Sequence, residues 1–226
     1  HRRLAPETPL VTDVRLQNLD QTYRGGIRAL QGVSLEAADG AYLVIVGPSG
    51  SGKTTLLRLL AGILSPDAGR VELDGEDLRG FDDAARRAFR ICNVGFVFQD
   101  FRLVEYLSVR ENLLLPFRIN NALSMESAGG LETLAESLGI EPYLEKYPDQ
   151  LSQGEKQRVA IGRALLPGPR LVLADEPTGN LDPDNTRRIM NLLFEQATDA
   201  TVVMVTHDHS LADRFDTVMD FGELQG

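Results

Sequence analysis

The sequence is poor in cysteine and lacks long hydrophobic runs. One of its 226 residues is a cysteine, Cys92, which excludes an internal disulfide and any zinc site built from several cysteines. Cys92 precedes an apolar stretch, so we expect a buried, unreactive thiol. No apolar run approaches the ~18 residues that a membrane-spanning helix needs. Any attachment to a membrane must therefore go through a partner.

Basic residues are also scarce. The chain has 23 Lys and Arg against 33 Asp and Glu, a formal net charge of −10. General nucleic-acid binders need a basic face for phosphate contacts, so we expect no nucleic-acid partner. The single cysteine fits a reducing compartment, and the first residues lack the apolar segment of a secretory signal. These features predict a cytoplasmic protein.

Short apolar strands alternate with helical patterns, which predicts an α/β fold. Residues 41–46 are apolar almost without interruption, as in a strand buried on both faces. A strand at residues 69–73 runs into the turn Asp74-Gly75, which favours a small antiparallel piece. We also expect a helix at 56–60 and strands at 14–19, 94–98, 171–174 and 201–205.

Residues 100–169 have few strand signals. They show helical patterns at 109–115, 131–138 and 155–166, and the polar stretch 120–130 predicts a flexible connection. The simplest architecture is one domain, residues 1–226, with a core at 11–98 and 170–226 that carries a β subdomain. Residues 99–169 would form a helical insertion into that core.

A glycine-rich loop lies between a predicted strand and a predicted helix. It fits G-x-x-x-x-G-K-[ST] in full and reads Gly47-Pro48-Ser49-Gly50-Ser51-Gly52-Lys53-Thr54. Its backbone N–H groups can face phosphates, and the helix start adds a positive dipole end. Lys53 is expected to contact the β and γ phosphates of ATP, and Thr54 to ligate Mg²⁺. Thr55, the next residue, belongs to the same nucleotide-binding set.

Two acids, Asp175 and Glu176, end another apolar strand. Acids often follow strands, so the pair alone is equally compatible with an ordinary strand end. With the glycine-rich loop upstream, Asp175 is expected to support Mg²⁺. Glu176 is expected to orient and deprotonate an attacking water.

The stretch Ser152-Gln153-Gly154-Glu155 has the spacing of a capping box. In the first interpretation, Ser152 serves only as the N-cap of the helix that follows. A capped helix start beside a glycine also suits an anion, so a phosphate site stays open as the second interpretation. The residues alone do not say whose phosphate it would be.

Six ordered motifs, GPSGSGKTT, FVFQD, LSQGE, LVLADEP, GNLD and THD, together resemble the ATPase subunit of ATP-binding cassette (ABC) transporters. The resemblance spans residues 11–222. DEPTGNLD, FVFQDF and ENLLLP are most similar to the branch that serves lipoprotein release, macrolide-type export and a division-linked complex. The resemblance implies a P-loop NTPase with a RecA-like core, a small antiparallel β subdomain and a helical insertion.

The resemblance also implies that the ATP site is shared between two chains. LSQGE is similar to the signature loop, commonly LSGGQ, which contacts the γ-phosphate of ATP held by a second copy. Ser152 and Gly154 keep the common form, whereas Gln153 and Glu155 depart from it. The loop 179–182 (GNLD) would cross the interface of this head-to-tail homodimer; alone it would be a turn.

Three further residues acquire roles only through the resemblance. Gln99 would sense Mg²⁺ and water, His207 would contact the γ-phosphate, and Tyr23 would stack on adenine. Without the family, they would be a solvated amide, a structural histidine and a packed strand residue. His209, close to His207, is expected to be structural.

The resemblance implies an ATPase that drives a transmembrane permease, at the cytoplasmic face of the inner membrane. Part of residues 101–106, which mix apolar side chains with Arg and Glu, is expected to line a groove for a permease helix. A core-packing loop is the alternative for this segment.

Three other functions compete with this interpretation. A soluble cassette without a permease usually has two cassettes in one chain or a coiled-coil insertion, and this chain has neither. A module that signals across the membrane without moving solute stays open. A P-loop kinase is disfavoured by the acidic pair together with LSQGE and His207.

Overall fold

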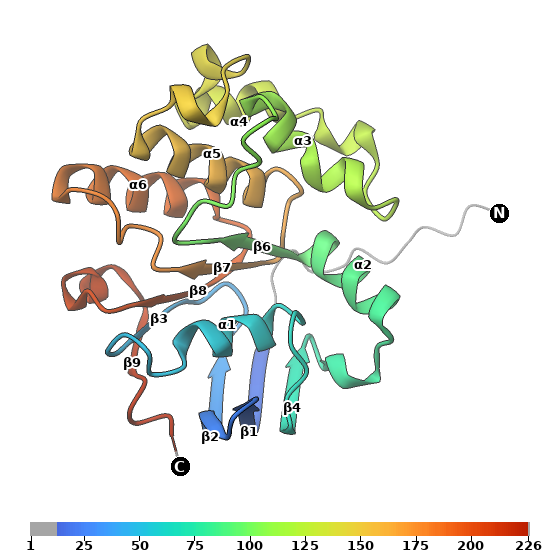
Figure 1. The fold of residues 1–226 in the computed structure, drawn as a ribbon, viewed down its shortest axis with the longest axis vertical. Coiled ribbons are helices and arrows are strands. Elements are labelled where there is room, and N and C mark those ends of the chain that lie inside the picture. Colours follow the sequence, from blue (N-terminus) through green and yellow to red (C-terminus); the bar gives the residue numbers. More distant parts are fainter. Residues whose placement is uncertain (1–12, 226) are drawn as a thin grey trace.

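The computed structural model describes residues 13–225, and five parallel strands form its central sheet (Figure 1). Their order is β6 (Val94–Val97), β7 (Leu171–Asp175), β8 (Thr201–Thr206), β3 (Tyr42–Val46) and β9 (Thr217–Asp220). β7, β8 and β3 are adjacent, so the loops that follow their carboxyl ends meet at one edge of the sheet. Within residues 13–225, no helix is long and apolar enough to span a bilayer.

The central sheet is buried on both faces, as the unbroken apolar run at 41–46 predicts. Leu43 and Ile45 pack into one hydrophobic cluster with α1 (Lys53–Leu60), whereas Val44 and Val46 pack into a second cluster with helices of the opposite layer. Successive strand residues point to opposite faces, so a strand covered on both sides has to be apolar throughout.

A second, antiparallel sheet lies on the α1 side (Figure 1). It has the order β2 (Ile27–Ala37), β1 (Val14–Tyr23), β4 (Ala68–Leu73) and β5 (Glu76–Asp77). All of its pairings are antiparallel. The α/β class and the small antiparallel piece are thereby confirmed.

Helices cover the other face of the central sheet (Figure 1). These are α3 (Val109–Ile119), α4 (Leu131–Ser137), α5 (Gln153–Leu165) and α6 (Pro183–Gln196), and their buried residues share one cluster. Short 3₁₀ turns join the elements, at Leu78–Gly80, Met125–Ala128, Glu141–Tyr143, Pro148–Gln150 and His209–Arg214. The stretch 120–130 therefore contains one ordered turn.

Helices α2 (Asp83–Asn93) and α6 and strand β2 were not predicted. α2 has no fully buried residue, but it is amphipathic, and Phe89 on its apolar face packs against the core. This amphipathic pattern is a helix signal in the sequence. The last turn of α2 carries Cys92, which is only partly buried, so the prediction of a buried thiol was wrong. Partial burial still raises the pKa of this thiol, which disfavours the reactive thiolate.

Candidate nucleotide site

The glycine-rich loop, called the P-loop below (residues 47–54), joins β3 to α1 as predicted. Its conformation needs glycine at Gly52, whose φ is +115° and where a Cβ would lie 2.3 Å from the carbonyl oxygen of Ala29. No side chain caps α1 at this end. The first turn of the helix therefore leaves backbone N–H groups directed at the loop, where a phosphate can bind.

Lys53 is the buried cation of this loop. Its Nζ donates to the carbonyl oxygens of Gly47 at 2.7 Å and Pro48 at 2.8 Å. It also lies 3.9 Å from Oε1 of Glu176. Burial lowers the pKa of Lys53, while the charges of Glu176 and Asp175 act in the opposite direction. These three residues form one electrostatic unit at the sheet edge.

Thr54 and Asp175 come together from different elements. Thr54 Oγ1 donates to Oδ1 of Asp175 at 3.1 Å, which links the start of α1 to the end of β7. Burial raises the pKa of Asp175, and the hydrogen bond from Thr54 partly opposes this rise. A hydroxyl and a carboxylate are hard oxygen donors of the kind Mg²⁺ accepts.

Glu176 and His207 follow the neighbouring strands β7 and β8. Glu176 Oε2 lies 2.5 Å from Nδ1 of His207, within hydrogen-bond distance. The Glu176 backbone has φ +46°, a conformation uncommon outside glycine, and its N–H donates to Val205 O at 2.9 Å. Such backbone positions concentrate at functional sites.

One cavity of about 330 Å³ collects most of the predicted nucleotide-site residues. It is lined by Tyr23, Ser49, Gly50, Gly52, Lys53, Thr54, Thr55, Gln99 and Glu176 among the predicted residues, and by Ile27, Arg28 and Ala29, which were not predicted. Ile27 is two-thirds exposed. The signal in the sequence that could have indicated its place in the site is an apolar residue just after the turn Gly25-Gly26. The hydroxyls of Tyr23 and Thr55 are 3.0 Å apart.

Gln99 also contacts the loop that follows Glu176. Asn180 Nδ2 donates to the Gln99 carbonyl oxygen at 3.2 Å, and a Cβ at Gly179 would lie 3.3 Å from Gln99 Nε2. The loop 179–182 is therefore packed beside the nucleotide cavity. The adenine role of Tyr23 and the sensing role of Gln99 stay predictions.

Ser152 and Gly154 do not line the nucleotide cavity. They stand at the start of α5, which covers the opposite face of the central sheet from α1 (Figure 1). Ser152 is exposed, whereas Gly154 is buried against Asn185 of α6. The predicted capping box is present in full. In a single chain, the Ser152 end of α5 therefore lies outside the nucleotide cavity at the P-loop.

A second cavity, of about 400 Å³, opens between α2, β6, α3 and α5. Four arginines line it, namely Arg87, Arg90, Arg102 and Arg163, and none of the described residues lining it is acidic. Arg163 donates at 2.6 Å to the carbonyl oxygens of both Phe101 and Arg102. Burial lowers its pKa to about 10. We call this cavity the arginine cleft.

The fold and the P-loop site define a nucleotide-hydrolysing P-loop enzyme of the α/β class. The ABC transporter family matches residues 30–179, so the chain belongs to this family. It is the ATP-binding subunit of an ABC transporter, and it is an ATPase.

Relatives and a solved structure agree with this assignment. A lipoprotein-releasing system ATP-binding protein, LolD 1 of Rhodopirellula baltica, is 45% identical, with 82% of this chain and 81% of that protein covered. LolD of Maricaulis maris is 40% identical, with 93% and 94% covered. A dimeric post-hydrolysis structure of the ATP-binding cassette MJ0796 with ADP and Pi matches at TM-score 0.82 and 36% identity, covering 92% and 93%.

Proposed function

We propose that two copies of this chain bind two ATP molecules between them, head to tail. The observation that carries this proposal is the separation of the site into two parts. Lys53, Thr54 and Glu176 meet in one cavity, whereas Ser152 and Gly154 stand outside it on an exposed helix start. A second copy can bring its Ser152 end to the γ-phosphate held by the first. The similar cassette structure is dimeric, which supports this arrangement.

In the proposed hydrolysis, Glu176 accepts a proton from a water whose oxygen attacks the γ-phosphorus. The bond from that phosphorus to the oxygen bridging the β-phosphate breaks, and its electron pair leaves on ADP. Lys53 and the N–H groups at the start of α1 offset the developing negative charge. The contact of His207 with Glu176 keeps the carboxylate oriented toward the water.

The residues present also fit Mg²⁺. Thr54, Asp175 and the amide oxygen of Gln99 would hold it, because each offers an oxygen donor near the P-loop. When bound, Mg²⁺ neutralises charge on the phosphates.

The decisive experiment is Glu176→Gln. The variant should still bind ATP, become a dimer by light scattering when ATP is added, and lose about 10²–10⁴-fold in turnover because the base is gone. Glu195→Gln, an exposed change on α6, should keep wild-type turnover. Near-wild-type hydrolysis by Glu176→Gln would remove Glu176 as the base. A variant that binds ATP yet stays monomeric would refute the shared site.

We further propose that a transmembrane permease docks a helix in the arginine cleft. The cleft combines apolar lining with exposed Ile63 and Ile119, and its arginines favour acidic residues on that helix. Residues 99–169 would act as the helical subdomain, and 11–98 with 170–226 as the core. Of the core residues, 11, 12 and 226 lie outside the described range. Docking would place the chain at the cytoplasmic face of the inner membrane.

A paired charge reversal tests this docking. Arg87→Glu with Arg102→Glu should reduce co-purification with the permease about tenfold, because two attractive contacts become repulsive. The ATPase of the isolated chain should stay within about twofold, and exposed Arg188→Glu should change neither. Undiminished co-purification would show that the permease does not dock in the arginine cleft.

The LolD relatives favour lipoprotein as the cargo of that permease. Reconstituted with it in vesicles, the wild-type chain should release lipoprotein only with ATP. ATP hydrolysis without release would instead support a signalling complex.

A further inference from the structure

At the start of α5, the Ser152 hydroxyl donates its proton to a residue of its own chain. Ser152 N–H and Ser152 Oγ both donate to Oε2 of Glu155, each at 2.7 Å. The Glu155 N–H in turn reaches Ser152 Oγ at 3.4 Å. A serine hydroxyl has one proton, so while Glu155 accepts it Ser152 has none for a phosphate.

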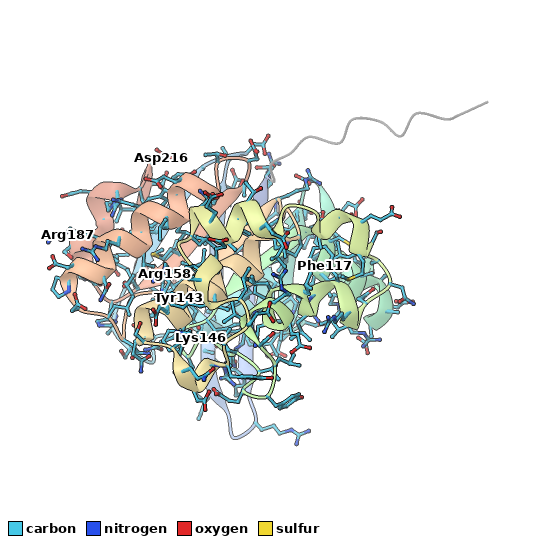
Figure 2. All side chains as sticks on the ribbon, turned by 90° about the horizontal axis from the view of Figure 1, so that it is seen from above. Phe117, Tyr143, Lys146, Arg158, Arg187 and Asp216 are labelled. Atoms are coloured by element: carbon cyan, nitrogen blue, oxygen red, sulfur yellow. The ribbon has the colours of Figure 1, made fainter. Side chains whose placement is uncertain are left out.

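Glu155 is held as a carboxylate. Hydrogen bonds from the Ser152 backbone, the largest cause, and from the Ser152 hydroxyl lower the pKa of Glu155. The hydroxyl of Tyr143 also hydrogen-bonds to Glu155, and the charge of Arg158 acts in the same direction. Figure 2 shows Tyr143 near Arg158 and Lys146, whose Nζ is 4.6 Å from the tyrosine ring centroid. The carboxylate is thus fixed beside the exposed Ser152.

We propose that Glu155 is a positioning residue that restrains ATP-driven closure of the dimer. This inference rests on the proposed function. When a second copy brings its γ-phosphate to Ser152, the hydroxyl must leave Glu155 and donate to the phosphate. The fixed negative charge of Glu155 also repels that phosphate at close range. Closure therefore has to overcome both the lost hydrogen bond and the repulsion.

The chain contains a matched capping box that serves as the control. In α3, Ser108 N–H donates to Glu111 Oε2 at 3.0 Å, and Glu111 N–H donates to Ser108 Oγ at 3.2 Å. Ser108 is buried, so this box has only a structural part. Glutamine supports a capping box as glutamate does, so Glu155→Gln and Glu111→Gln should both keep their helix starts.

The experiment measures the ATP concentration that gives half-maximal dimer, with each change added to Glu176→Gln. Glu155→Gln should lower this concentration about three- to tenfold, because the amide carries no charge and its oxygen is a weaker acceptor for the serine proton. Glu111→Gln should leave it within about twofold. Without ATP, the two variants should have equal melting temperatures. If Glu155 had only a structural role, its replacement would not shift the ATP requirement while the melting temperature stayed the same.

An unchanged or increased ATP requirement for Glu155→Gln would overturn the inference. Should that variant fold poorly, Glu155→Ala removes the same charge and is expected to shift the requirement in the same direction. If Glu176→Gln alone forms no dimer with ATP, the proposed function fails instead, so the two failures are distinguishable.

Discussion

Helices α1 and α5 both begin at a loop that is expected to face a phosphate, but their first turns are satisfied differently. At α1, Gly52 provides no side-chain cap, and a buried cation, Lys53, follows at once. At α5, the side chains of Ser152 and Glu155 accept from each other's backbone N–H groups, and the charged residue is an anion. The first end is open to phosphate, whereas the second is occupied by its own chain.

This difference predicts that the starts of α1 and α5 bind phosphate under different conditions. An uncapped, cationic helix start surrounded by glycine backbone can bind phosphate without rearrangement. At the self-capped start, the Ser152 hydroxyl has to leave Glu155 before it can donate to a phosphate. This difference favours ATP binding at the P-loop end of a single chain and, in the proposed dimer, contact between the Ser152 end and ATP held by the second chain.

The largest effect is expected from filling the P-loop end. Gly52→Ala adds a Cβ 2.3 Å from Ala29 O at a φ of +115°, so the loop must shift. We expect at least a ~100-fold loss of ATP affinity by titration calorimetry, together with about 1–3 kcal/mol of lost stability. Gly80→Ala, which places its Cβ in open space, should melt like the wild type. Unaltered ATP affinity in Gly52→Ala would show that the cradle is adaptable.

A smaller effect is expected at the Ser152 end. Ser152→Ala removes a helix cap worth about 1 kcal/mol, a fall of roughly 2–4 °C in melting temperature. Steady-state hydrolysis should drop about 10- to 100-fold, while the ATP affinity of the monomer stays within about twofold, because that affinity resides at the P-loop. Ser108→Ala loses a comparable cap and should hydrolyse ATP normally once folded. A large loss of monomer affinity in Ser152→Ala would contradict the shared site.

Much of the nucleotide site was predictable because its signals are local. A strand, a glycine-rich turn and a helix are contiguous in the chain, Asp175 ends an apolar strand, and Glu176 follows it directly. The Ser-to-Glu spacing predicts the capping box, and the box is present. Helix α6 was missed, although Asp182 before Pro183 is a helix-start signal and the Asp182 side chain accepts from two backbone N–H groups.

Long-range pairings were not predictable in the same way. Ile27, Arg28 and Ala29 reach the nucleotide cavity only because β2 passes beside the P-loop, and no local pattern states that. The partial exposure of Cys92 similarly follows from where α2 lies on the surface. Propensity and periodicity describe neighbours in sequence, whereas exposure depends on what covers a residue.

The P-loop, the acid pair Asp175-Glu176 and the capped start of α5 could be derived from the sequence alone, because each depends on residues within one turn or one strand end. Only the tertiary structure decided that Glu176 meets His207 and that Thr54 meets Asp175, since these contacts need β3, β7 and β8 to be neighbours. It also decided which acceptor takes the Ser152 proton. Hydrogen bonds are directional and short, so a spacing predicts that a partner exists but coordinates decide which one is bound.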